Sequence, residues 1–157
     1  MGIEYKKRLD KAVEAVGLNQ ETTKVVEEDK ILENVLFAAS QAQDCIYATM
    51  DLAEEKNLPI NQKYHDIVKE KLDAGVRVVR IGFGETSDFQ IIKSRLGLEQ
   101  NTYTFKRNPI IEDYQRLLMV DKKFLFFKKG GSFYKTQDPA LIIQFLNYFA
   151  ETYERSI

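Results

Sequence analysis

The chain has 157 residues, of which 44% are hydrophobic and 30% charged, and its formal net charge is -1. This length suits one domain with its own core, and the composition is that of a globular rather than a disordered protein. The near-neutral charge argues against a nucleic-acid partner, and a charged N-terminus without a long apolar stretch argues against a signal peptide or a membrane partner. The single cysteine, Cys45, excludes an internal disulfide and favours the cytoplasm.

The first part of the chain predicts a helix followed by a polar hinge. Residues 3–16 carry apolar side chains at helical spacing, and Gly17 stands where a helix would end. The segment "NQETTKVVEED" that follows is polar. We therefore divide the chain into an N-terminal helix and hinge, residues 1–29, and an α/β domain, residues 30–157.

The next segments alternate between helix and strand. "KILENVLFAASQAQ" predicts an amphipathic helix, and "CIYATMDL" a buried strand rich in β-branched and aromatic residues. "KYHDIVKEKLDAG" predicts a helix that ends at Gly75, and "VRVVRIGFG" a second strand directly after it. A strand, a helix and a strand in this order predict two parallel strands joined by a crossover.

The C-terminal half predicts a hairpin and a last helix. "DFQIIKSRLGL" favours a short helix and "NTYTFKR" a strand, while "YQRLLMVD" and "KFLFFKKG" favour a hairpin, with "GGSFYKT" as a further edge strand. Asp138 and Pro139 suit the cap and first turn of a helix with a wide apolar stripe. The fold class is therefore α/β: a mixed sheet with a parallel centre and an antiparallel hairpin, sandwiched by helices.

The element order and the stretch "EDYQRLLMVDKKFLFFKKGGSFY" together resemble one half of the phospholipase D superfamily, over roughly residues 30–155. The family signature is His-x-Lys-x-x-x-x-Asp on a strand, followed by a second strand and a Gly/Ser-rich segment. Here the spacing is kept with changed residues, Tyr114 for the His, Arg116 for the Lys and Asp121 for the Asp. The resemblance implies a phospholipase-D-like half-domain with a degenerate motif.

The changed residues imply a loss of catalysis with anion binding kept. In the family the His attacks phosphorus, whereas a tyrosine with an ordinary pKa of about 10 is a poor nucleophile at neutral pH. Arg116, by contrast, carries a planar fork of donors that suits phosphate or carboxylate. The alternative is structural, with Tyr114 and Arg116 covering the edge of a sheet.

A second group of candidate ligand residues follows the strand "VRVVRIGFG". Loops at the carboxyl ends of parallel strands line ligand crevices in open α/β sheets, so Thr86 and Ser87 are candidates to meet an anion held by Arg80 or Arg116. The Gly-x-Gly there lacks the third glycine of a dinucleotide site, and the scattered carboxylates have no metal-ligand spacing. We expect neither a cofactor nor a metal, and His65 at a helix start is expected to be an exposed residue.

These observations predict a catalytically inactive module that binds a small anionic ligand or a protein partner, with a regulatory role, as a homodimer. The homodimer follows from the resemblance, because a single half with an exposed apolar run "FLFF" would recover the family's paired arrangement by pairing with itself. Two alternatives stay open. One is a divergent phosphodiesterase or nuclease using Tyr114 as nucleophile, and the other is an interaction subunit that docks through its N-terminal helix.

Overall fold

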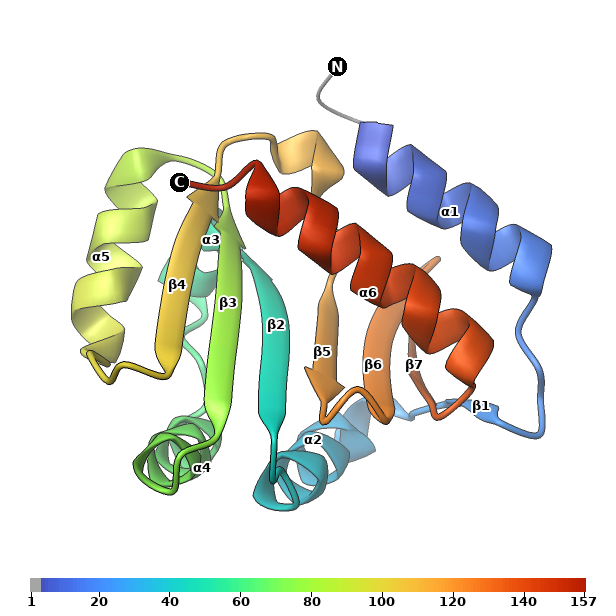
Figure 1. Ribbon diagram of the computed structural model, residues 1–157, viewed down its shortest axis with the longest axis horizontal. Helices are drawn as coiled ribbons and strands as arrows, with labels where there is room; N and C mark the ends of the chain where they lie inside the picture. Colours follow the sequence, from blue (N-terminus) through green and yellow to red (C-terminus); the bar gives the residue numbers. More distant parts are fainter. Residues whose placement is uncertain (1–3) are drawn as a thin grey trace.

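A seven-stranded mixed sheet lies between two layers of helices in the computed structural model, which describes residues 4–157 (Figure 1). Residue 3, the start of the predicted first helix, lies outside the described residues. From one edge of the sheet to the other, the strands are β1 (Thr23–Val25), β7 (Ser132–Thr136), β6 (Phe124–Lys129), β5 (Leu117–Val120), β2 (Cys45–Asp51), β3 (Arg77–Phe83) and β4 (Tyr103–Asn108).

The strand directions confirm the predicted mixed α/β sheet. Strands β2, β3 and β4 are parallel and form one half of the sheet, while β5, β6, β7 and β1 are antiparallel neighbours in the other half. The two halves meet where β5 pairs antiparallel with β2. All four residues of β5 are buried, as expected for a central strand covered on both faces.

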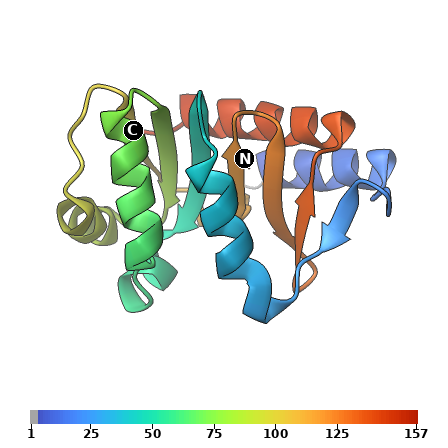
Figure 2. The same cartoon turned by 90° about the horizontal axis from the view of Figure 1, so that it is seen from below.

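The helices divide between the two faces of the sheet (Figure 2). One face carries α1 (Glu4–Val16) and α6 (Pro139–Glu154). The other carries α2 (Ile31–Ser40), α3 (Leu52–Asn57), α4 (Gln62–Asp73) and α5 (Thr86–Leu96). Two short 3-10 helices, η1 (Glu28–Lys30) and η2 (Ile111–Asp113), complete the chain.

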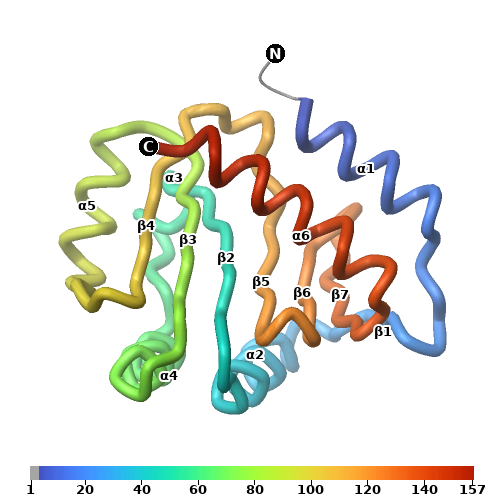
Figure 3. The backbone as a smooth tube through the Cα atoms, in the orientation of Figure 1, coloured from blue at the N-terminus to red at the C-terminus, as the bar shows by residue number. Residues whose placement is uncertain are grey.

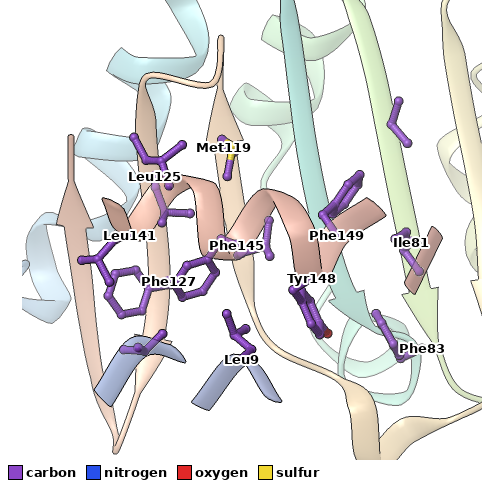
Figure 4. Close-up of a cluster of buried hydrophobic side chains, with 14 residues drawn as sticks. Leu9, Ile81, Phe83, Met119, Leu125, Phe127, Leu141, Phe145, Tyr148 and Phe149 are labelled. Atoms are coloured by element: carbon purple, nitrogen blue, oxygen red, sulfur yellow. The ribbon is translucent and has the colours of Figure 1, made fainter. Parts of the chain in front are cut away.

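The larger core lies between the sheet and α6 (Figure 4). Phe145, Tyr148 and Phe149 of α6 pack on apolar side chains from β3, β5 and β6, and the ring of Phe145 lies 4.8 Å from that of Phe127. Burying each such side chain contributes about 1.5–3 kcal/mol. Because the apolar stripe of α6 is wide, this helix covers strands from both halves of the sheet and holds them together.

Within the N-terminal segment, the described residues 4–29 are joined to the rest by the same core and the same sheet. Leu9 and Val13 of α1 are buried in the cluster around α6. After α1 the chain runs to the edge of the sheet, where β1 pairs with β7 (Figure 3). There the hydroxyls of Thr23 and Thr136 are hydrogen-bonded at 2.8 Å. The segment predicted to be a hinge thus contains an edge strand, β1, which its polar sequence did not predict.

The run Phe124–Phe127, predicted to be exposed, is mostly buried. Phe124 is partly exposed, but Leu125, Phe126 and Phe127 are covered because β6 lies inside the sheet and has helices on both faces. The expectation of an exposed "FLFF" surface was therefore wrong, and the homodimer stays a prediction from the family resemblance.

The predicted hairpin between β5 and β6 turns at Asp121 and Lys122. Both have positive φ, 56° and 57°, and Lys123 N–H donates to the Val120 carbonyl at 3.0 Å, as in a type I′ turn. The Asp121 carboxylate accepts hydrogen bonds from the backbone N–H groups that lead into β2, those of Gln43, Asp44 and Cys45. Partial burial acts to raise the pKa of Asp121, but these three donors outweigh it and hold the pKa below its ordinary value.

We predict that Asp121→Asn destabilises the fold in a pH-dependent way. Because the folded pKa of Asp121 is depressed, its carboxylate stabilises the fold above the ordinary pKa, and this contribution is lost as the pH falls through the folded pKa. Urea unfolding at pH 7 should show a loss of about 1–3 kcal/mol, and the difference should shrink as the pH is lowered to 2. The control Asp44→Asn, at an exposed neighbour, should change stability by less than about 0.5 kcal/mol. An unchanged unfolding midpoint for Asp121→Asn at pH 7 would contradict the prediction.

Candidate functional site

Arg80 is a buried cation in the middle of β3. It lies beside Ala48 of β2 and Phe105 of β4, on the face covered by α2 to α5, and is only 1% exposed. Its Cζ lies 5.9 Å and 5.7 Å from the ring centroids of Tyr64 and Tyr103. Its Nη1 donates to the Tyr103 hydroxyl at 3.4 Å, a long hydrogen bond.

The second terminal nitrogen of Arg80, Nη2, is buried and has no hydrogen-bond partner among residues 4–157. A desolvated guanidinium ordinarily requires a carboxylate or several acceptors, because burying an unpaired charge is costly. The two tyrosine rings offset part of this cost by cation–π attraction, worth about 2 kcal/mol when desolvated. The guanidinium therefore retains an unused donor that suits an anionic oxygen.

Arg80 lines a cavity of about 460 Å³ on this face of the sheet, which we call the Arg80 cavity. Its walls come from the sheet, from α2 and from the segment that joins α3 to α4. Arg116 lines the same cavity, so two predicted anion-binding residues 36 positions apart in sequence lie on one cavity. A volume in the range of about 300–1,000 Å³ is typical of small-molecule sites.

Arg116 lies at the rim and is paired with an acid. Its Nη1 lies 3.1 Å from Glu54 Oε1 of α3, and both side chains are about half exposed. The partner helix α3 lies close to β3 because position 82 is glycine, where a Cβ atom would stand 2.5 Å from Leu52 Cδ2. The charge of the Arg116 guanidinium is thus balanced by Glu54, whereas no carboxylate of the described residues pairs with Arg80.

The segment that carries Arg116 is held mainly by side-chain hydrogen bonds, beside one long backbone bond from Lys128 N–H to the Arg116 carbonyl at 3.4 Å. The predicted strand at residues 114–121 is shorter in the structure, and β5 begins at Leu117. Thr49 of β2 bridges the gap, since its hydroxyl donates to the Gln115 carbonyl at 2.6 Å and accepts from Leu117 N–H at 3.0 Å. The Gln115 amide in turn donates to the Lys128 carbonyl at 2.7 Å.

Tyr114 lies towards the opposite face of the sheet, that of α6 and α1. It packs on the core around α6, with its ring 5.6 Å from that of Phe83. It lines a separate hollow of about 390 Å³ beneath α1, the α1 hollow, together with Arg116 and Lys6. Burial raises the pKa of Tyr114 to about 12, although Arg116 nearby acts to lower it. The phenol is therefore fully protonated at neutral pH.

The other predicted site residues do not line the Arg80 cavity. Asp121 lies at the far end of β5 from Arg116 and bonds to the backbone before β2. Thr86 and Ser87 are exposed at the start of α5. The loop before them is held by Arg107, whose Nη1 donates to the Gly84 carbonyl at 2.8 Å.

Several residues that shape the site were not singled out as ligand residues from sequence. Tyr64 and Tyr103 have the pattern of ordinary core aromatics, and their meeting around Arg80 follows from the strand register and the packing of α4. Glu55 also lines the cavity, and burial raises its pKa, while the Ile60 N–H and the Arg80 guanidinium oppose that shift. An arginine placed between apolar neighbours on a strand was the one sequence signal.

Three further expectations concern His65, metals and membranes. His65 is half-buried rather than exposed, and burial lowers its pKa so that it is neutral at pH 7. Among residues 4–157, no three His, Cys, Asp or Glu side chains lie close enough together to hold a metal ion. None of the helices in this part of the chain has the length and apolarity needed to cross a membrane.

The backbone is similar to those of several solved structures. NucT from Helicobacter pylori matches with a TM-score of 0.59 and 12% identity, over 87% of this chain and 96% of that chain. Nuc from Salmonella typhimurium, a phospholipase D family member, matches with a TM-score of 0.57 and 13% identity, over 86% and 94%. TrmBL2, an archaeal chromatin protein, matches with a TM-score of 0.63 and 15% identity, over 98% of this chain and 61% of that chain.

These similarities define the class of the fold. No protein-family model matches the sequence, and no curated protein matches it. The chain has the phospholipase-D-like fold, as its element order predicted, and the sequence identities are low enough that the similarity concerns the fold alone. The substrates and partners of these proteins are not thereby assigned to this chain.

We predict that Arg80→Met makes the unliganded protein more stable. Methionine fills a similar volume without a buried charge, and replacing buried ionic groups by apolar ones is often stabilising by about 1–4 kcal/mol. Denaturant unfolding in a buffer of chloride salts would measure the change. The control Arg77→Met, at the exposed start of the same strand, should shift stability by less than about 0.5 kcal/mol. A loss of several kcal/mol for Arg80→Met alone would mean that the guanidinium is a structural element rather than an unsatisfied site.

Proposed function

We propose that the chain is a catalytically inactive phospholipase-D-like module that binds a small anion at Arg80. The observation that carries the proposal is the Nη2 atom of Arg80, a buried cationic donor without a partner among the described residues, on a residue that lines a ligand-sized cavity. Buried polar groups are normally hydrogen-bonded, and an unsatisfied one calls for an explanation such as a ligand. A bound carboxylate or phosphate oxygen would complete the coordination of this guanidinium.

The proposed lack of catalysis rests on the residue that stands at the position of the nucleophile. The chain has a tyrosine where the resembling family has its attacking histidine, and its single histidine, His65, lies on α4, away from Tyr114. A phenol with a pKa of about 12 is a weak nucleophile at neutral pH unless a base removes its proton. Arg116, the natural partner for a phosphate there, is paired with Glu54. A divergent phosphodiesterase using Tyr114 is therefore the less supported hypothesis.

A regulatory role is the part of the proposal that concerns partners. TrmBL2 is described as an archaeal chromatin protein with a novel mode of DNA binding, and its similarity to this chain extends over 98% of the chain. The net charge of -1 gives no support to DNA binding here. Docking through the N-terminal helix is also less supported, because the apolar residues Leu9 and Val13 are used within the chain. We propose instead that anion binding at Arg80 is the regulatory signal.

Anion binding should appear as a thermal stabilisation that depends on Arg80. Formate, acetate and inorganic phosphate are titrated against the wild-type protein at constant ionic strength in place of chloride. At ten times its dissociation constant, a bound anion stabilises the fold by about 1.4 kcal/mol, which is seen as a rise in the midpoint of thermal unfolding. Arg80→Met should remove this rise and Arg77→Met should keep it. Equal shifts in all three proteins would refute binding at Arg80.

The chain should not hydrolyse bis-p-nitrophenyl phosphate at neutral pH. Release of p-nitrophenol is followed by its absorbance, with wild-type protein and Tyr114→Phe purified side by side. Both should match the buffer rate, because the phenol stays protonated well below a pKa of about 12. Hydrolysis by the wild type that Tyr114→Phe abolishes would establish the enzyme and overturn the proposal of an inactive module.

A further inference from the structure

The Arg80 cavity combines a buried cation with long apolar walls. Side chains from α2, β5, β6 and β7 and from the loop before α4 form these walls, among them Ile31, Val35, Ile60, Leu118, Phe126 and Phe133. Leu32 and Leu58 also line the cavity and are 43% and 74% exposed, whereas Arg80 is 1% exposed. Apolar surface therefore extends from the buried guanidinium to solvent, which a bare inorganic ion would leave unused.

The charges around the cavity disfavour multiply charged anions. Two arginines face four acidic residues along the lining, Glu28, Asp51, Glu54 and Glu55. Arg116 is paired with Glu54, so Arg80 is left as the cation without an acidic partner within the described part of the chain. A ligand with one negative charge meets this donor, whereas a second or third negative charge would meet carboxylates near the rim.

We infer that the ligand is an amphipathic monocarboxylate, with its carboxylate on the Arg80 guanidinium and its apolar chain or ring along the cavity towards Leu32. This inference rests on the proposed function and names the chemical class of its anion. Nη2 supplies the hydrogen bond and the charge, and the apolar walls supply affinity in proportion to the ligand surface that they cover. The carboxylates at the rim supply selectivity against phosphate esters and other polyanions.

The test measures affinity against chain length. Acetate, butanoate, hexanoate and octanoate are titrated by calorimetry into the wild-type protein below micelle-forming concentrations, with inorganic phosphate and octan-1-ol as comparison probes. Each methylene that the walls bury should tighten binding about fourfold, until the chain reaches solvent. Octan-1-ol should bind at least tenfold more weakly than octanoate, and phosphate more weakly than octanoate. Arg80→Met should remove the preference of carboxylate over alcohol.

A matched pair of variants on α2 tests the apolar wall. Leu32→Gln should weaken octanoate binding several-fold and leave acetate binding unchanged, because only the longer chain reaches this side chain. Phe37→Gln, at a 68% exposed position on the same helix that does not line the cavity, should bind both as the wild type does. Circular dichroism of the two variants checks that α2 is intact.

The possible failures separate the inference from the proposed function. If acetate, octanoate and phosphate bind equally well, and all through Arg80, the anion site stands and the amphipathic ligand is overturned. Tighter binding of phosphate than of octanoate would also overturn the amphipathic ligand and leave the anion site standing. Equal binding of octan-1-ol and octanoate would overturn the proposed anion function as well. The same holds if every anion binds Arg80→Met as tightly as it binds the wild type.

Discussion

The candidate site depends on one constraint: Arg80 places a buried charge on a face of the sheet that is covered mainly by apolar side chains. Along β3, Val79, Ile81 and Phe83 face α6, while Val78 and Arg80 face the helices of the other layer. Arg80 therefore occupies a position that stability alone would give to an aliphatic residue. The guanidinium is kept there by two tyrosine rings rather than by a carboxylate, which leaves its charge available to a ligand. Natural proteins commonly retain such destabilising groups where function requires them.

Much of the fold could be predicted from the sequence because its strongest patterns are local. The stripe of α6, the apolar run of β5 and the Gly75 stop before β3 each depend on neighbouring residues, and each appears in the structure where it was expected. The short elements β1 and α3 were missed. A strand of three residues with one buried side chain has no clear alternation, and its place is decided by pairing with β7 more than a hundred residues away.

The candidate site was predictable in part, for a similar physical reason. Arg80 could be named as an arginine between apolar neighbours on a strand and Arg116 from the spacing of the motif, and both line one cavity. Their surroundings could not be named, because Tyr103 reaches Arg80 through the register of β4, and Glu54 reaches Arg116 through the close packing of α3 on Gly82. Asp121 illustrates the converse. Its spacing fits a family motif, whereas its carboxylate binds backbone N–H groups that a motif does not reveal.

Tyr114, at the first position of the motif, and Arg80 lie towards opposite faces of the sheet, whereas Arg116 lines both the α1 hollow and the Arg80 cavity. In the family that the chain resembles, two motif-bearing halves meet at the motif residues. Here Tyr114 lies beneath α1, whose Asp10 and Glu14 line the same hollow as Arg116. An anion entering that hollow would also meet three lysines, Lys6, Lys128 and Lys129, but Lys6 is paired with Asp10 and Arg116 with Glu54. At Arg80 it would meet a cation whose Nη2 donor has no partner in the described structure. The buried donor without a partner, rather than the sum of the charges along the lining, therefore favours the Arg80 cavity over the α1 hollow as the proposed anion site. Such a site would not depend on the chemistry of the motif.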